Sequence, residues 1–155
     1  YHVICRFAPA TGTTVATQRL FCGMAVSTAN PTDVQPSSLP SIIGVGYDSA
    51  DTNWQLMSND ATSTATKIDT GIARPTTDRP GLYSVAIFCP AGSTFIGITF
   101  TDESTGSYGT YKFTTDLPSS TSSVGLRCWH SVGGNAGTAS ITGVTLFNLY
   151  AETDN

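Results

Sequence analysis

Hydrophobic and polar residues alternate along many short stretches of the chain, a pattern typical of β-strands whose two faces meet different surroundings. These stretches are rich in β-branched and aromatic residues, and Gly, Pro, Ser, Asp or Asn bound them. About ten segments fit the description, at 2–8, 17–27, 41–48, 53–59, 65–71, 81–89, 94–100, 108–113, 123–131 and 139–152.

Helical signals are weak by comparison. No segment repeats apolar residues at the i, i+3, i+4, i+7 spacing over two or three turns, and the one helical candidate is a turn within 30–38. Tight hairpins are expected at 48–53, 59–64 and 106–108. Many short strands joined by close turns predict an all-β fold, an antiparallel β-sandwich of jelly-roll-like type with little or no helix.

The last predicted strand is apolar on both faces. Strict alternation assigns Val144, Leu146 and Tyr150 to one face. It assigns Ile141, Phe147 and Leu149 to the other. A strand of this kind is expected inside a packed sandwich or at a contact between subunits.

A length of 155 residues suits one domain spanning residues 1–155, large enough to build a core without added crosslinks. The chain starts at Tyr1 without a Met or an apolar leader, so we expect it to be a fragment of a longer protein. No apolar run approaches the roughly 20 residues that a membrane span requires, and membrane insertion is not expected.

The chain is poor in charge. Charged residues make up 12% of it, against about 25% in an average soluble domain, and Ser, Thr, Asn, Gln and Gly supply the missing polarity. Seven Lys and Arg with a net charge of -4 leave few cations for a phosphate backbone, which argues against nucleic acid. A neutral, hydroxyl-rich surface suits sugars, or burial against copies of the same chain, because neither partner requires desolvation of many ions.

Four cysteines, at positions 5, 22, 89 and 128, stand far apart in apolar runs. Metal sites usually take closely spaced pairs such as C-x-x-C, and none occurs. We interpret these cysteines as reduced, buried thiols, with disulfides in one of three connectivities as the alternative. We expect no metal and no cofactor.

Catalytic signals are equally sparse. A glycosidase needs two carboxylates at a defined separation, and no spacing among the eleven Asp and Glu singles out such a pair. A G-x-S-x-G elbow is absent, and only His2 and His130 are available as bases. The sequence therefore predicts that the protein is not an enzyme.

The run 43–69 (IGVGYDSADTNWQLMSNDATSTATKID), preceded by QRLFCGM and STANPTDVQPSSL, resembles a domain near the C-termini of tailed-bacteriophage tail fibres. The likeness continues through YSVAIFCPAGSTF, the tripeptide Asp-Leu-Pro at 116–118, and LRCWHSVGGNAG. It implies a β-rich homotrimer, joined to the rest of the tail fibre, made in the bacterial cytoplasm and placed at the distal end of the virion.

The resemblance suggests recognition of a bacterial surface glycan, lipopolysaccharide or capsule, during host attachment. Sugar rings stack on Trp or Tyr while their hydroxyls bond polar side chains. Trp54 lies in a strand pattern that predicts burial, so the hypothesised ligand site comprises Tyr108, Trp129, His130 and Asn135. The alternative is a structural module that trimerises the fibre and binds no sugar.

Overall fold

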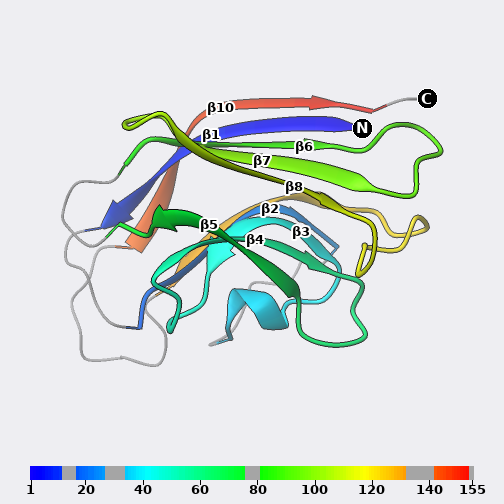
Figure 1. Ribbon diagram of the computed structural model, residues 1–155, viewed down its shortest axis with the longest axis horizontal. Coiled ribbons are helices and arrows are strands. Elements are labelled where there is room, and N and C mark those ends of the chain that lie inside the picture. Colours follow the sequence, from blue (N-terminus) through cyan, green and yellow to red (C-terminus); the bar gives the residue numbers. More distant parts are fainter. Residues whose placement is uncertain (12–16, 27–33, 76–80, 132–141, 154–155) are drawn as a thin grey trace.

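The computed structural model describes residues 1–11, 17–26, 34–75, 81–131 and 142–153. In this part of the chain, ten strands form two five-stranded antiparallel sheets packed face to face (Figure 1). Each of the ten predicted segments overlaps one of these strands, so the predicted antiparallel β-sandwich is confirmed. The single 3-10 turn, η1 (Pro36–Ser38), falls within the predicted helical segment. None of the described helices is long and apolar enough to cross a membrane.

The first sheet has the order β10-β1-β6-β7-β8 and the second has the order β5-β4-β3-β2-β9. The first is built from β10 (Thr142–Glu152), β1 (His2–Thr11), β6 (Tyr83–Phe88), β7 (Ile96–Asp102) and β8 (Ser107–Phe113). The second is built from β5 (Thr66–Ala73), β4 (Asn53–Asn59), β3 (Ile42–Tyr47), β2 (Arg19–Ala25) and β9 (Gly125–Ser131).

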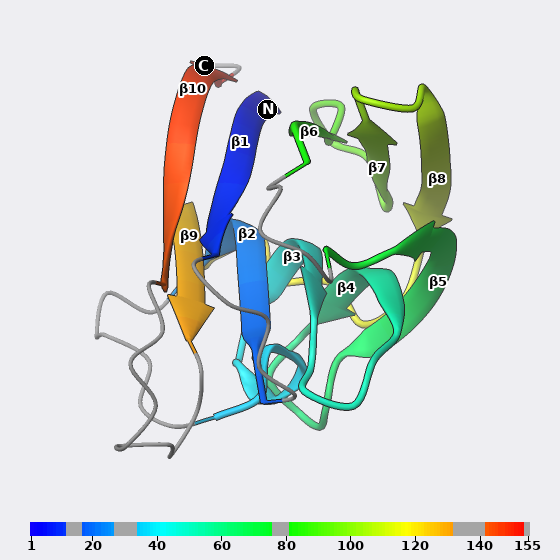
Figure 2. The same cartoon turned by 90° about the vertical axis from the view of Figure 1, so that its left-hand side faces the viewer.

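The first two strands pair with the last two. β1 pairs with β10 and β2 pairs with β9, both antiparallel, as the outer strands of a jelly roll do. Consecutive strands pair as neighbours in two meanders, one from β2 to β5 and the other from β6 to β8. Figure 2 shows the result: β10 lies above β9 on one edge of the sandwich, and β8 lies above β5 on the other.

The core lies between the two sheets and is centred on Trp54, whose exposed fraction is 0%. Its ring centroid is 4.9 Å from that of Tyr47, 4.8 Å from Tyr83 and 4.9 Å from Phe100. Tyr47 and Trp54 come from the second sheet, and Tyr83 and Phe100 from the first. Edge-on and tilted ring contacts of this kind join the two sheets, and the burial predicted for Trp54 is confirmed.

A smaller apolar cluster covers the outer face of the second sheet. It contains Phe21, Ile42 and Met57, over which the segment around η1 places Leu39. Trp129 packs against this cluster from β9. The second sheet is therefore buried on both sides over its central strands, which explains why β3 is buried along its whole length.

A β-bulge in the β1/β10 pair corrects the predicted faces of the last strand. Phe7 pairs with Leu146 and Arg6 pairs with Asn148, so Phe147 is an extra residue between them. Because Cys5 and Phe7 face the core, their partners Leu149 and Leu146 lie on the inner face together. The assignment of Leu149 to the face opposite Leu146 was wrong because strict alternation allows for no inserted residue. Ile141 lies outside the described residues.

We expect Trp54→Ala to lower the free energy of unfolding by about 3–5 kcal/mol, because the cavity would remove the shared contact between the sheets. Tyr108→Ala is the matched control: it truncates an aromatic ring that is 69% exposed, and its effect should stay within about 0.5 kcal/mol. Urea denaturation followed by far-ultraviolet circular dichroism measures both. Equal midpoints for the two variants would contradict this description of the core.

Candidate functional site

The structure separates the residues predicted to bind a ligand. Tyr108 lies on the edge strand β8, whereas Trp129 and His130 lie on β9, at the other edge of the sandwich (Figure 2). Asn135 lies outside the described residues. Tyr108 and Trp129 are therefore not brought together within one chain.

Trp129 and His130 are neighbours in the chain, and they point to opposite faces of the second sheet. Trp129 packs on the outer cluster, while the Nδ1 atom of His130 lies 3.0 Å from the carbonyl oxygen of Gly143 on β10. Burial lowers the pKa of His130, so its ring is neutral near pH 7. His130 thus contributes to the contact between β9 and β10.

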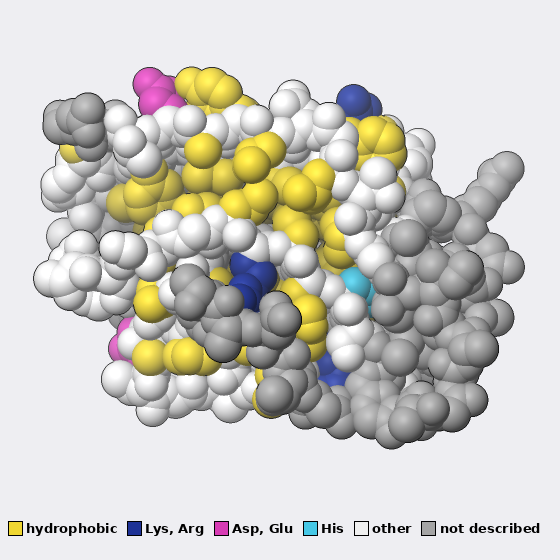
Figure 3. All heavy atoms as spheres, turned by 180° about the vertical axis from the view of Figure 1, so that it is seen from behind, with side chains coloured by type: hydrophobic (Ala, Val, Ile, Leu, Met, Phe, Trp, Pro, Cys, Tyr) yellow, Lys and Arg dark blue, Asp and Glu magenta, His cyan; other side chains and the backbone are white. Residues whose placement is uncertain are grey.

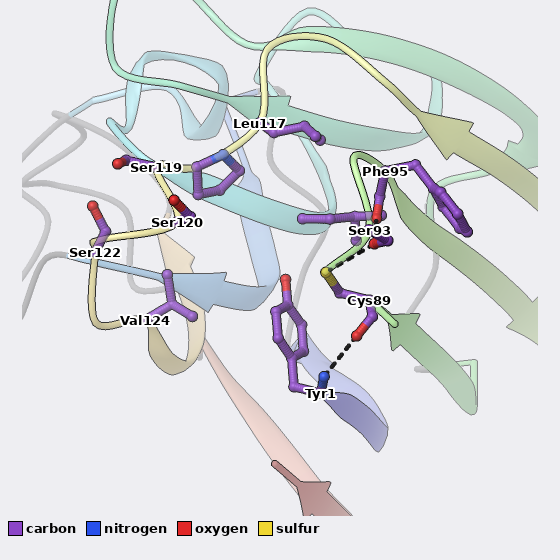
Figure 4. A pocket seen from close by; sticks show the side chains of 11 residues that line it. Tyr1, Cys89, Ser93, Phe95, Leu117, Ser119, Ser120, Ser122 and Val124 are labelled. Atoms are coloured by element: carbon purple, nitrogen blue, oxygen red, sulfur yellow. Dashed lines mark hydrogen bonds between the residues drawn. The ribbon is translucent and has the colours of Figure 1, made fainter. Parts of the chain in front are cut away.

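A pocket of about 480 Å³ opens at the end of the sandwich where the N-terminal strand begins, within the roughly 300–1,000 Å³ usual for ligand sites. Three segments form it: the β6–β7 loop, the β8–β9 loop and Tyr1, which directly precedes β1 (Figure 4). Its lining comprises Tyr1, Cys89, Ser93, Phe95, Ile96, Leu117, Pro118, Ser119, Ser120, Ser122 and Val124.

The described lining of this end pocket carries hydroxyl groups and apolar surface, and no charged side chain. Figure 4 shows the Tyr1 ring rising between the two loops, with Ser119, Ser120 and Ser122 on one side and Ser93 on the other. The Phe95 ring turns away, and the Lys112 ammonium lies 4.0 Å from its centroid. Tyr1 is therefore the aromatic surface that the pocket offers.

Backbone pairing holds Tyr1 in place. The Tyr1 nitrogen donates to the Cys89 carbonyl oxygen at 2.7 Å, and the Cys89 nitrogen donates to the Tyr1 carbonyl oxygen at 2.9 Å. Burial, and to a smaller extent the nearby Cys89, raise the pKa of the Tyr1 hydroxyl to about 12. The hydroxyl is therefore protonated at neutral pH and can both donate and accept a hydrogen bond.

Asp116 anchors the loop that forms the other wall. Its carboxylate accepts hydrogen bonds from the backbone nitrogens of Asp60 at 2.8 Å and Thr66 at 2.7 Å. Its carbonyl oxygen accepts a bond from the Ser58 hydroxyl at 2.6 Å. These contacts attach the start of the β8–β9 loop to the β4–β5 hairpin, and they set where Leu117 and the following serines lie.

Two basic side chains of the second sheet are held by contacts within the chain. The Lys67 ammonium lies 3.0 Å from a carboxylate oxygen of Asp48 and 2.7 Å from one of Asp51. The Arg74 guanidinium donates hydrogen bonds to the backbone carbonyls of Gln18 and Ser49. These two cations therefore stabilise the turns around 48–51.

Sequence reasoning did not identify the end pocket. One signal was present: the residues 119–123 are five consecutive Ser and Thr residues, in a segment expected to be a loop. Nothing local showed that this loop faces Tyr1 and the β6–β7 loop, because those segments are distant in the chain.

Comparison with known proteins adds no family: no protein-family model matches the chain, and no curated protein matches it. The β-sandwich supports many unrelated functions, so the fold alone does not select one. The function is therefore argued from the pocket and from the surface.

We expect Asp116→Ala to lower the free energy of unfolding by about 1–2 kcal/mol, because a part-buried and an exposed backbone donor lose a charged acceptor. Asp116 has a φ of 55°, so part of that loss is strain on alanine. Asp116→Gly removes the carboxylate without strain, and Asp116→Asn retains one acceptor oxygen and tolerates this φ; the asparagine variant should lose least. Urea midpoints unchanged in all three variants would show that the contact does not hold the loop.

Proposed function

We propose that this chain is the receptor-binding module of a tailed-bacteriophage tail fibre, and that its end pocket binds a neutral portion of a bacterial surface polysaccharide. The observation that carries the proposal is the lining: four serines, a protonated tyrosine hydroxyl and apolar side chains, with no charged side chain among the described lining residues. Sugar hydroxyls exchange hydrogen bonds with such groups, and a pyranose face packs on an aromatic ring. The resemblance of 43–69 to tail-fibre domains supports the setting.

Binding rather than hydrolysis is the role this lining favours. Cleavage of a glycosidic bond normally requires two carboxyl groups, one on each side of the bond. The described lining includes no Asp or Glu. A single shallow site of this kind would bind in the millimolar range, worth about 4 kcal/mol. Several copies on one fibre would raise the avidity by orders of magnitude.

We expect Ser120→Trp to abolish glycan binding, because an indole at this position would fill the pocket. Within the described chain the Ser120 hydroxyl makes no hydrogen bond that the change would break. Thr94→Trp is the matched control, because it places the same ring at an exposed position of the β6–β7 loop outside the lining. Binding of purified host polysaccharide, measured by saturation-transfer NMR, should be lost in the first variant and kept in the second.

Two results would contradict the end pocket as the site. One is full binding by Ser120→Trp. The other is loss of binding in Tyr108→Ala, Trp129→Ala or His130→Ala with Ser120→Trp unaffected, which would return the site to the residues predicted from the sequence.

A second role, assembly of the fibre, is supported by a separate observation on the β10 edge. β10 ends the order of its sheet, so one side of its backbone has no strand beside it in the described chain. Leu146, Phe147 and Leu149 on this strand are 46%, 59% and 48% exposed. Figure 3 shows hydrophobic side chains gathered in a band on the face where β10 lies above β9.

An apolar groove of about 320 Å³ continues this band between β10 and β9, lined by Val3, Met24, Leu126, Leu149 and Ala151 among others. Contiguous exposed apolar surface of this kind marks a contact surface. Its proposed occupant is another copy of the chain, and the number of copies, three, rests on the tail-fibre resemblance. The groove adjoins the end pocket, because Tyr1 and Val124 line both of them, whereas Leu146 and Phe147 lie outside both linings.

We expect Phe147→Glu to convert a trimer into monomers, since three carboxylates would have to be desolvated in the contact. Tyr108→Glu, on the opposite edge, should leave the trimer intact. Sedimentation velocity distinguishes the species. A monomeric parent protein, or identical behaviour of both variants, would rule out the β10 edge as the subunit contact.

A further inference from the structure

Three of the four cysteines meet inside the sandwich. The Sγ atom of Cys22 lies 2.8 Å from that of Cys128 and 3.6 Å from that of Cys5, and all three sulfur atoms lie within 4.8 Å of one another. Cys89 is elsewhere, with its sulfur 3.6 Å from the Ser93 hydroxyl. We call the first three the thiol cluster.

Strand pairing produces the thiol cluster. Cys22 on β2 and Cys128 on β9 are direct partners in the antiparallel register, which sets their Cα atoms roughly 4.5–5.5 Å apart. That spacing lies within the roughly 4.4–6.8 Å that a disulfide spans. Cys5 reaches the same point from β1, in the opposite sheet.

The environment of the cluster favours one thiolate shared among three sulfur atoms. Hydrogen bonds from Cys128 and Cys22 lower the pKa of Cys5, whereas burial raises the pKa of Cys22. The hydrogen bond with Cys22 lowers the pKa of Cys128, but the bond with Cys5 and burial outweigh it and raise that pKa to about 12. Cys5 and Cys22 are fully buried, and Cys128, on the edge strand, is only partly buried. A reagent would therefore meet Cys128 first.

The distances fit a disulfide better than a metal ion. Two thiolates on one zinc, each at about 2.3 Å with tetrahedral angles, stand roughly 3.8 Å apart. The 2.8 Å between Cys22 and Cys128 is about 1 Å too short for this arrangement. It lies closer to the roughly 2.05 Å of a sulfur–sulfur bond.

We propose that Cys22 and Cys128 are a site of reversible oxidation by small-molecule disulfides, with Cys5 as an exchange partner. The Cys128 sulfur attacks one sulfur of the oxidant while its proton passes to the Cys5 thiolate, forming a mixed disulfide and releasing one small thiolate, which takes up that proton from Cys5. The Cys22 sulfur then attacks Cys128, forms the bridge, and expels the second small thiol with the proton from Cys22. Two protein thiols are oxidised, and one disulfide is reduced to two thiols.

Cys5 makes a second bridge possible without further oxidation. Its thiolate lies 3.6 Å from the Cys22 sulfur, and attack there would form Cys5–Cys22 and release Cys128 as a thiolate. The first bridge joins two strands of one sheet, and the second joins the two sheets. This inference goes beyond glycan binding and does not depend on it.

Tryptic mapping tests the proposal directly, because Arg6, Arg19, Lys67, Lys112 and Arg127 place the four cysteines on four different peptides. The folded protein is incubated with glutathione disulfide, unfolded in N-ethylmaleimide to label every remaining thiol, digested and analysed by mass spectrometry. The expected product links peptide 20–67 to peptide 128–155 and is lighter by two hydrogens than its two reduced parts. Dithiothreitol should restore both peptides.

Three variants sharpen the test. Cys89→Ser is the matched control and should form the same link, Cys5→Ser should retain it, and Cys128→Ser should instead link the peptide ending at Arg6 to 20–67. Labelling of all four cysteines by N-ethylmaleimide after oxidation would overturn the proposal. So would a stoichiometric zinc complex of the reduced protein that protects the three cluster thiols, or a link that forms only in urea.

Discussion

The pairing of the first two strands with the last two is the constraint on which the functional features of this protein depend. Because β1 pairs with β10 and β2 with β9, both chain ends lie in the same half of the sandwich. That arrangement places Tyr1 opposite the β8–β9 loop, sets Cys22 against Cys128, and leaves β10 as an open apolar edge. Loss of this pairing would remove the pocket, the thiol cluster and the edge together, while the two meanders could still stack around Trp54.

Most of the fold was predictable from the sequence because its signals are local. Alternating residues and turn formers marked every strand, and the apolar neighbours of Trp54 indicated its burial. The faces of β10 were predicted wrongly, since a single inserted residue, Phe147, shifts every later side chain to the other face. Whether a strand contains a bulge depends on its partner, and the partner of β10 lies at the far end of the chain.

The candidate site was less predictable for the same reason. Tyr108 and Trp129 were grouped by residue type, but their strands occupy opposite edges. The end pocket combines three distant segments, and Asp116, which fixes one wall, acts on a hairpin more than forty residues away. The cysteines were interpreted as reduced, buried thiols without a metal because no two are closely spaced in sequence, yet the fold places the sulfur atoms of three of them within 4.8 Å of one another. Spacing rules detect sites built on one turn and miss sites built across a sheet.

In the proposed role, the charge-poor chain offers its end pocket to a sugar and the adjoining β10 edge to neighbouring subunits. The central claim is that the two loops around Tyr1 hold the glycan. Hydrogen–deuterium exchange with and without host polysaccharide tests it most directly. The account predicts slower exchange in the loops at 89–95 and 117–124 on binding, with β8 unchanged; slower exchange confined to β8 or β9, with both loops unaffected, would contradict it.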